Sequence, residues 1–197
     1  MSSLGLILFQ AGVSFPHLLL VPHNNTELTT WFFDDTNKDF AYEYYKVFLQ
    51  MLNRVDAPQS HWFLKAPIHT FFLDTLLRYY PSASIIMTHR RLEEVLPSWA
   101  RLCSVSMSLY LSSSKADVDS DRYADVKRDF YVLAVMIQRL IKFRYAHKHN
   151  EILDILYDDL FEQPIETVRR IYAHFGFSWS DGFVRILKVN KDAIYTR

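Results

Sequence analysis

The sequence has little cysteine, no net charge and no long apolar run, and each shortage excludes a class of protein. Cys103 is the single cysteine among 197 residues, so no disulfide can form within the chain and a structural zinc site is disfavoured. Lysine plus arginine and aspartate plus glutamate both total 22, so the overall charge attracts neither nucleic acid nor an anionic membrane. The apolar run at 4–9 follows no positively charged segment and is too short to span a bilayer. We therefore expect no membrane segment in this chain and favour a cytoplasmic location for it.

Glycine is also scarce, with four residues at positions 5, 12, 176 and 182. A P-loop needs a glycine-rich turn followed by lysine and serine or threonine, because its backbone N–H groups cradle phosphates. None of the four glycines stands in such a setting, and the nearest imitation, residues 10–14 (Gln-Ala-Gly-Val-Ser), lacks a basic residue. The sequence therefore has no P-loop, which disfavours a small kinase-like phosphotransferase.

Aromatic residues are plentiful, with 15 phenylalanines and 12 tyrosines, which argues against disorder. In the central stretch, residues 61–103, short unalternating apolar runs at 62–64 and 85–87 each end in polar residues. This pattern is typical of strands buried on both faces of a parallel sheet, and we expect a third strand at 152–157. The length suits one domain with a hydrophobic core. We therefore predict a single α/β domain over residues 1–197 with a central parallel sheet.

Apolar residues at helical spacing predict the helices around these strands. We expect helices over 37–55, 71–80, from 92 onward, 123–147 and 164–175, with a serine- and aspartate-rich surface loop at 104–121. The expected buried face of the first helix consists of Phe40, Tyr44, Phe48, Met51, Leu52 and Val55. The expected buried stripe of the helix at 123–147 consists of Phe130, Leu133, Ala134, Ile137, Leu140 and Ile141, with Arg139 facing outward. Gly176 is placed to end the last helix.

Cationic and hydroxyl side chains follow the predicted strand at 85–87. Arg90 comes directly after this strand, and Ser98 lies about two turns into the next helix. Ligands of open α/β sheets bind beyond the carboxyl ends of the strands, and a guanidinium with a neutral donor beside it suits a phosphate. The pair therefore indicates a site for a polyanionic ligand. The alternative is that Arg90 is a surface cation and Ser98 a hydroxyl that packs its helix.

A second pair, Lys65 and His69, follows the predicted strand at 62–64. A lysine at this place can neutralise a transferring anionic group, and a histidine four residues later can act as a general base. The alternative is an exposed lysine and a histidine that caps the helix after Pro67.

Together these residues resemble the motifs of sulfotransferases that use 3′-phosphoadenosine 5′-phosphosulfate (PAPS). Residues 65–69 (Lys-Ala-Pro-Ile-His) are similar to the motif Lys-Ser-Pro-x-His of one branch. Residues 88–90 (Thr-His-Arg) with Ser98 resemble the family's second motif, and residues 157–160 (Tyr-Asp-Asp-Leu) resemble its Tyr-x-Asp-Leu segment. The resemblance runs through most of residues 35–180.

The resemblance implies a three-layer fold related to nucleotide kinases, with a central parallel sheet and flanking helices. It also implies roles for five residues. Arg90 and Ser98 would hold the 3′-phosphate of PAPS, Tyr157 would lie beside the adenine, Lys65 would approach the sulfuryl group, and His69 is a candidate base. PAPS would be the co-substrate without any metal, and the acceptor would be a small molecule or carbohydrate with a hydroxyl or amine.

The sequence also departs from the family pattern. Family members usually carry an N-terminal Pro-Arg/Lys-Ser-Gly-Thr loop for the 5′-phosphosulfate, and none occurs in the 64 residues before Lys65. Arg91-Leu92 replaces the usual Asp-Pro, and Ala66 replaces serine. We therefore expect a chain truncated at the N-terminus and possibly at the C-terminus, with little transfer activity alone. The alternative is an inactive family member that binds 3′-phosphoadenosine nucleotides weakly or not at all, or serves as a scaffold.

Overall fold

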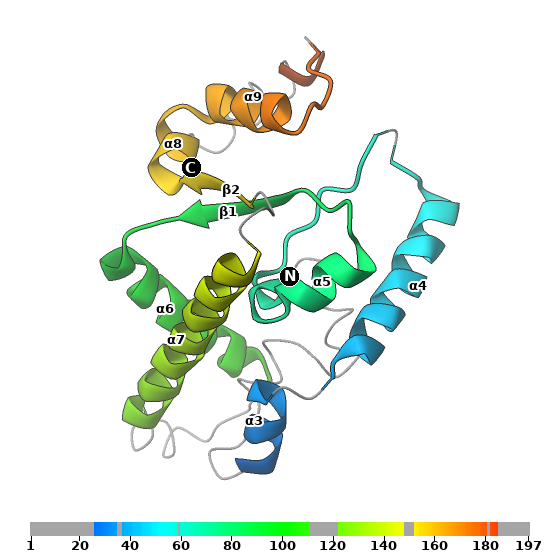
Figure 1. The fold of residues 1–197 in the computed structure, drawn as a ribbon. Helices are drawn as coiled ribbons and strands as arrows, with labels where there is room; N and C mark the ends of the chain where they lie inside the picture. Colours follow the sequence, from blue (N-terminus) through cyan, green and yellow to red (C-terminus); the bar gives the residue numbers. More distant parts are fainter. Residues whose placement is uncertain are drawn as a thin grey trace. The chain divides into compact units, whose positions relative to one another are not determined.

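The structure is a computed structural model, and it divides into two compact units that are each described by themselves (Figure 1). The first unit contains residues 1–82 and 96–147, and the second contains residues 83–95 and 148–197. The described residues are 26–34, 37–58, 60–110, 122–147, 152–180 and 182–184. The segment at 10–14 lies outside them. The predicted single domain over residues 1–197 stays a prediction.

The second unit contains the parallel sheet. Strand β1 (Ile85–His89) and strand β2 (Ile152–Leu156) pair in parallel, from Ile85 opposite Ile152 to His89 opposite Leu156. Ile155 is buried, and the other residues of the two strands are half-buried or exposed. The predicted α/β class with a parallel sheet and flanking helices is thereby confirmed, and two of the three predicted strands form.

Two helices follow β2 in the same unit. Helix α8 (Tyr157–Glu162) begins directly after the strand, and helix α9 (Pro164–His174) begins at a proline, whose fixed φ suits the first helical turn. The Thr167 hydroxyl donates a 2.9 Å hydrogen bond to the Asp159 carbonyl and so joins the two helices. This arrangement places the start of α8 at the carboxyl end of the sheet.

Gly176 ends α9, as predicted. Its φ of +68° lies in the left-handed region, which glycine adopts without a Cβ penalty. The Gly176 N–H donates to the Ala173 carbonyl at 3.3 Å, and the Phe177 N–H donates to the Tyr172 carbonyl at 2.8 Å. These two bonds form a Schellman motif, which satisfies the last carbonyls of the helix.

The first unit is helical around an aromatic core. It contains α3 (Thr26–Phe33), α4 (Asp39–Val55), the 3₁₀ helix η1 (Pro67–Phe71), α5 (Leu73–Tyr79) and α7 (Arg122–Ala146). Helix α6 (Leu92–Tyr110) begins in the second unit and continues in the first. The buried core consists of Phe32, Ala41, Tyr42, Tyr45, Ile68, Phe71, Phe72 and Val132. Helix α5 contacts both α4 and α7 (Figure 1), so the segment from Pro67 to Tyr79 is held from two sides.

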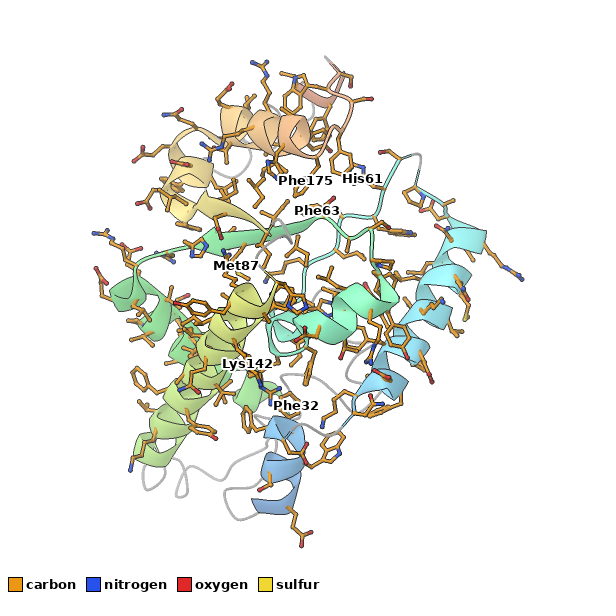
Figure 2. All side chains as sticks on the ribbon, viewed as in Figure 1. Phe32, His61, Phe63, Met87, Lys142 and Phe175 are labelled. Atoms are coloured by element: carbon orange, nitrogen blue, oxygen red, sulfur yellow. The ribbon has the colours of Figure 1, made fainter. Side chains whose placement is uncertain are left out.

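The predicted strand at 62–64 is wrong. Residues 61–66 belong to no helix or strand, and the side chain of Phe63 is 82% exposed (Figure 2). The Trp62 indole donates a 3.1 Å hydrogen bond to Asn53 of α4, which ties this segment to a helix. A strand needs a neighbouring strand to accept its hydrogen bonds, and among the described residues only β1 and β2 form a sheet.

The predicted buried faces of two helices are also largely wrong. In α4 the buried residues are Ala41, Tyr42 and Tyr45, whereas Phe40, Tyr44, Met51 and Val55 are exposed. In α7 the buried residues are Val132, Leu133 and Phe143, whereas Phe130, Ile137 and Ile141 are exposed. Aromatic and apolar residues stand on more than one face of both helices, so periodicity alone does not select the buried face. Part of the predicted loop at 104–121 is also helical, because α6 runs to Tyr110.

Candidate functional site

The ends of the two parallel strands bring Arg90 and Tyr157 together. His89 pairs with Leu156, so the next residue of each chain segment leaves the same edge of the sheet. The guanidinium carbon of Arg90 lies 4.6 Å from the ring centroid of Tyr157, a cation–π contact. Two of the predicted cofactor-binding residues are therefore neighbours at the carboxyl end of the sheet, although their role stays a prediction.

Glu94 orients the arginines at this strand end. Its two carboxylate oxygens accept hydrogen bonds from Arg90 Nε and Arg91 Nη2, both at 2.6 Å. The hydrogen bonds from Arg90 and then from Arg91 hold the pKa of Glu94 below its usual value. Within the described part of the chain, no hydrogen bond is formed by the terminal nitrogens of Arg90. The guanidinium is thus fixed through Nε while its outer nitrogens can still donate to an oxyanion.

Sequence reasoning missed a second polar pair on the sheet. His89 Nε2 lies 2.6 Å from a carboxylate oxygen of Asp154, and both side chains are partly exposed. Asp154 pairs with Met87 in the register, so it is the diagonal neighbour of His89 on one face. The alternation of side chains in paired strands is the signal that finds such a pair, once the register is known.

Ser98 is an exposed residue of α6, about two turns from the helix start. It belongs to the first unit, whereas Arg90 belongs to the second. The predicted pairing of Ser98 with Arg90 on one phosphate therefore stays a prediction.

Lys65 and His69 lie on either side of the start of η1. Lys65 is an exposed residue at the end of the extended segment 61–66. Pro67 is the first residue of η1, and His69 is half-buried two residues later. The proline fixes the entry to this turn, so the backbone holds the histidine side chain in a defined place.

His69 is enclosed by tyrosines of α4. Its Nδ1 lies 2.9 Å from the Tyr42 hydroxyl oxygen, and its ring centroid lies 5.6 Å from that of Tyr42 and 5.9 Å from that of Tyr45. Burial lowers the pKa of His69 to about 4. The imidazole is therefore neutral near pH 7 and a weak proton acceptor, since a general base works best with a pKa near the working pH.

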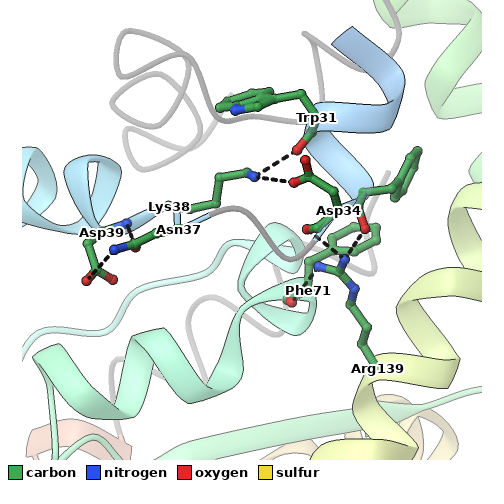
Figure 3. Close-up of polar contacts among 8 residues, drawn as sticks. Trp31, Asp34, Asn37, Lys38, Asp39, Phe71 and Arg139 are labelled. Carbon is green, nitrogen blue, oxygen red and sulfur yellow. Dashed lines mark hydrogen bonds and ion pairs between the residues drawn. The ribbon is translucent and has the colours of Figure 1, made fainter. Parts of the chain in front are cut away.

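A polar cavity of about 370 Å³ in the first unit is a separate feature. It is lined by Asp34, Asn37, Lys38, Phe71, Phe72, Thr75, Arg78 and Arg139. Lys38, which is 3% exposed, donates to the Trp31 carbonyl at 2.7 Å and to the Asp34 carboxylate at 3.1 Å (Figure 3). Arg139 donates to the backbone carbonyls of Phe71, at 3.2 Å, and Phe33. Lys38 neutralises the Asp34 carboxylate, and Arg139 ties two backbone carbonyls together. Both cations thus serve the chain's own groups, so we interpret the cavity as structural.

This network corrects the prediction that Arg139 faces outward. Its guanidinium bridges the end of α3 to η1, two segments that are distant in sequence (Figure 3). Three or more metal-ligating side chains gather nowhere in the described part of the chain. Of the helices described, none has the length and apolar character needed to cross a membrane.

Comparisons with known proteins agree on one family. A model of the sulfotransferase family matches residues 17–181. The structure is similar to sulfotransferase STF1 from Mycobacterium tuberculosis H37Rv, with 28% identity, a TM-score of 0.71 and coverage of 89% of this chain and 45% of that one. It also shares its fold with sulfotransferase STF9 from Mycobacterium avium, with 22% identity, a TM-score of 0.69 and coverage of 79% and 38%. The chain thus spans less than half the length of either structure, and no curated protein matches it.

Proposed function

We propose that this chain, which belongs to the sulfotransferase family, binds PAPS and transfers its sulfuryl group to a hydroxyl or amine of a small-molecule or carbohydrate acceptor. The observation that carries the proposal is the contact of Arg90 with Tyr157 at the carboxyl ends of two paired parallel strands. This is the edge at which open α/β sheets bind their ligands.

The residues at the strand ends fit the nucleotide part of PAPS. The outer nitrogens of Arg90 can donate two hydrogen bonds to the 3′-phosphate while Glu94 holds Nε. Tyr157 offers a partly exposed aromatic surface beside this cation, which suits an adenine ring. Ser98 would add a neutral donor to the same phosphate. The set of a fixed guanidinium, an aromatic ring and a hydroxyl matches a phosphorylated adenosine.

Lys65 and His69 are the proposed transfer residues. PAPS, when bound, supplies an activated sulfuryl group attached to its 5′-phosphate. The exposed ammonium of Lys65 would neutralise negative charge on that group, as preorganised cations do in other transfers of anionic groups. The sequence makes His69 a candidate base beside the acceptor, and its hydrogen bond to Tyr42 decides which role its ring can take.

Calorimetry with adenosine 3′,5′-bisphosphate tests the nucleotide site. Arg90→Ala should weaken binding by about 1.5–3 kcal/mol, the worth of a charge-assisted contact, and Ser98→Ala by about 0.5–1.5 kcal/mol. Arg169→Ala is the matched control, because Arg169 also pairs with a glutamate (Glu166, 3.4 Å) and lies over an aromatic ring in the same unit. Equal affinities of the wild-type and Arg90→Ala chains would contradict the assignment.

A second candidate function is nucleotide binding without transfer. The sequence lacks the glycine loop that would donate backbone N–H groups to the 5′-phosphosulfate, and losing one such donor typically costs about a hundred- to a thousandfold in rate. If this second function is the correct one, the chain should show little transfer of labelled sulfate from PAPS to a panel of phenols, sterols, sugars and amines. Turnover near one per second by this chain would instead favour the enzyme.

A further inference from the structure

The contact between Tyr42 and His69 contains information about where the histidine carries its proton. Each group can donate or accept, so the 2.9 Å separation of the hydroxyl oxygen and Nδ1 fits two arrangements. In one, Tyr42 donates to a bare Nδ1, and the ring proton is on Nε2. In the other, Nδ1–H donates to the tyrosine oxygen, and Nε2 has the free lone pair that a general base requires.

The surroundings of Tyr42 select the first arrangement. Tyr42 is 1% exposed, so water does not reach its side chain. Nδ1 of His69 is the hydrogen-bond partner of the hydroxyl among the described residues. If Nδ1 donated, the hydroxyl proton would be buried without an acceptor, which is strongly unfavourable. If Tyr42 donates, one bond satisfies the hydroxyl proton and the Nδ1 lone pair, and Nε2–H remains as a donor for another acceptor.

The other groups that face the ring are consistent with a neutral histidine. Among the described residues, the rings in contact with the imidazole are those of Tyr42 and Tyr45 of α4. Behind them, Tyr79 of α5 stacks on Tyr42, and Tyr80 contacts Tyr45. Burial raises the pKa of Tyr42, and it raises that of Tyr80 to about 12. These hydroxyls therefore keep their protons across the working pH range, and Tyr42 stays a donor.

We propose that Tyr42 is a positioning residue that holds His69 as the neutral tautomer with its proton on Nε2. Because the proposed function puts His69 beside the transferring group, its Nε2–H then donates a hydrogen bond to an oxygen of the acceptor or of the sulfuryl group. His69 is half-buried, and among the described residues Nε2 is not one of the fully buried atoms without a partner. The ring keeps its proton, so the proton of the acceptor passes to solvent water as its bond to sulfur forms and adenosine 3′,5′-bisphosphate leaves. It acts as a neutral donor, a role that a histidine with a lowered pKa can serve.

Nitrogen-15 NMR of the imidazole groups tests the tautomer directly in the 197-residue chain. Spectra at pH 7 would be compared with those of His69→Gln, which identifies the His69 signals. We expect a protonated Nε2 and an unprotonated Nδ1 for His69. A protonated Nδ1, or a doubly protonated ring, would overturn the proposal.

Two tyrosine variants separate the hydrogen bond from ring packing. Tyr42→Phe removes the donor, so the His69 ring should populate both tautomers, and its two nitrogen signals should move toward each other. Tyr45→Phe is the matched control, because Tyr45 is similarly buried on the same helix and contacts the ring, but its hydroxyl has no hydrogen-bond partner among the described residues. It should leave the nitrogen signals in place. Equal shifts in both variants, or none in Tyr42→Phe, would refute the positioning role.

The NMR spectra are recorded without nucleotide, so the tautomer that they report does not depend on whether the proposed function is correct. Calorimetry with adenosine 3′,5′-bisphosphate on the same chain reports on the nucleotide site. Binding with the opposite tautomer would reject the role of Tyr42 and retain the function. The expected tautomer without binding would retain Tyr42 as the residue that sets the tautomer and reject the use of His69 in sulfuryl transfer.

Discussion

The half-buried His69 should make the chain less stable as the pH falls from 7 to 5. Burial lowers the pKa of this residue from 6.5 to about 4. Between these values the unfolded chain binds a proton that the folded chain rejects. Stability therefore increases with pH in this window. The contribution of His69 is fully present above pH 6.5 and is lost as the pH falls toward 4.

The size of the effect follows from the shift. A lowering by this amount corresponds to roughly 3 kcal/mol of folding free energy in total. Between pH 7 and pH 5 about 2 kcal/mol of it should be lost, because the unfolded imidazole is almost fully charged at pH 5. Most carboxylates titrate below pH 5, and the pKa of Glu94 is itself lowered by its arginine partners. Carboxylates therefore contribute little in this window, and the His69→Gln variant separates His69 from the other seven histidines of the chain.

Urea unfolding at pH 7, 6 and 5 measures this loss, with His69→Gln as the control. Glutamine retains an oxygen that can accept the Tyr42 hydrogen bond but cannot titrate. The variant should show less than about 0.5 kcal/mol of change over the same window. Hydrogen exchange of the α4 amides would show that the change arises in the helix that contacts His69. The reasoning is refuted if the wild-type chain loses no stability, or if His69→Gln loses as much.

Two further predictions concern stability. Arg139→Met should destabilise the first unit by about 2–3 kcal/mol, because buried backbone carbonyls of Phe33 and Phe71 lose a charged donor; urea midpoints compared with the exposed control Lys142→Met check this, and equal midpoints would contradict it. Gly176→Ala should lower the free energy of unfolding by about 1–2 kcal/mol. The loss comes from the left-handed φ alone, since an added Cβ would meet nothing within 4 Å. An unchanged thermal midpoint would show that the helix end relaxes without strain.

The two strands of the sheet could be predicted from the sequence because the signal for each of them is local. β1 and β2 are short apolar runs that end in polar residues, and a helix precedes or follows each of them. The run at 62–64 has the same appearance but forms no strand. The difference is non-local, because a strand exists only where another strand accepts its hydrogen bonds. Three apolar residues in a row carry no information about that partner.

The contact at the strand ends was partly visible in the sequence, whereas the contact of Tyr42 with His69 was not. Arg90 directly follows a predicted strand, and the family resemblance assigned Tyr157 to the same cofactor, but the sequence did not show that the two side chains touch. Tyr42 is 27 residues from His69, and the helical pattern placed Phe40 and Tyr44 in the core instead. Aromatic residues around α4 make several faces equally apolar. The choice among them depends on contacts with residues distant in sequence, such as those of Tyr42 and Tyr45 with His69.

The two proposed groups of residues, one in each unit, use opposite physical means. Arg90 is a charged group at the surface, held by Glu94 and by the ring of Tyr157, so it keeps its charge for a phosphate. His69 is a neutral group among tyrosines, and burial there excludes the charged form. The charge of an arginine can be read from the sequence alone, because arginine is ionised at any working pH. The protonation state of histidine is set by its neighbours, so the contact with Tyr42 is the observation from which we propose that this residue, expected as a base, is arranged as a donor.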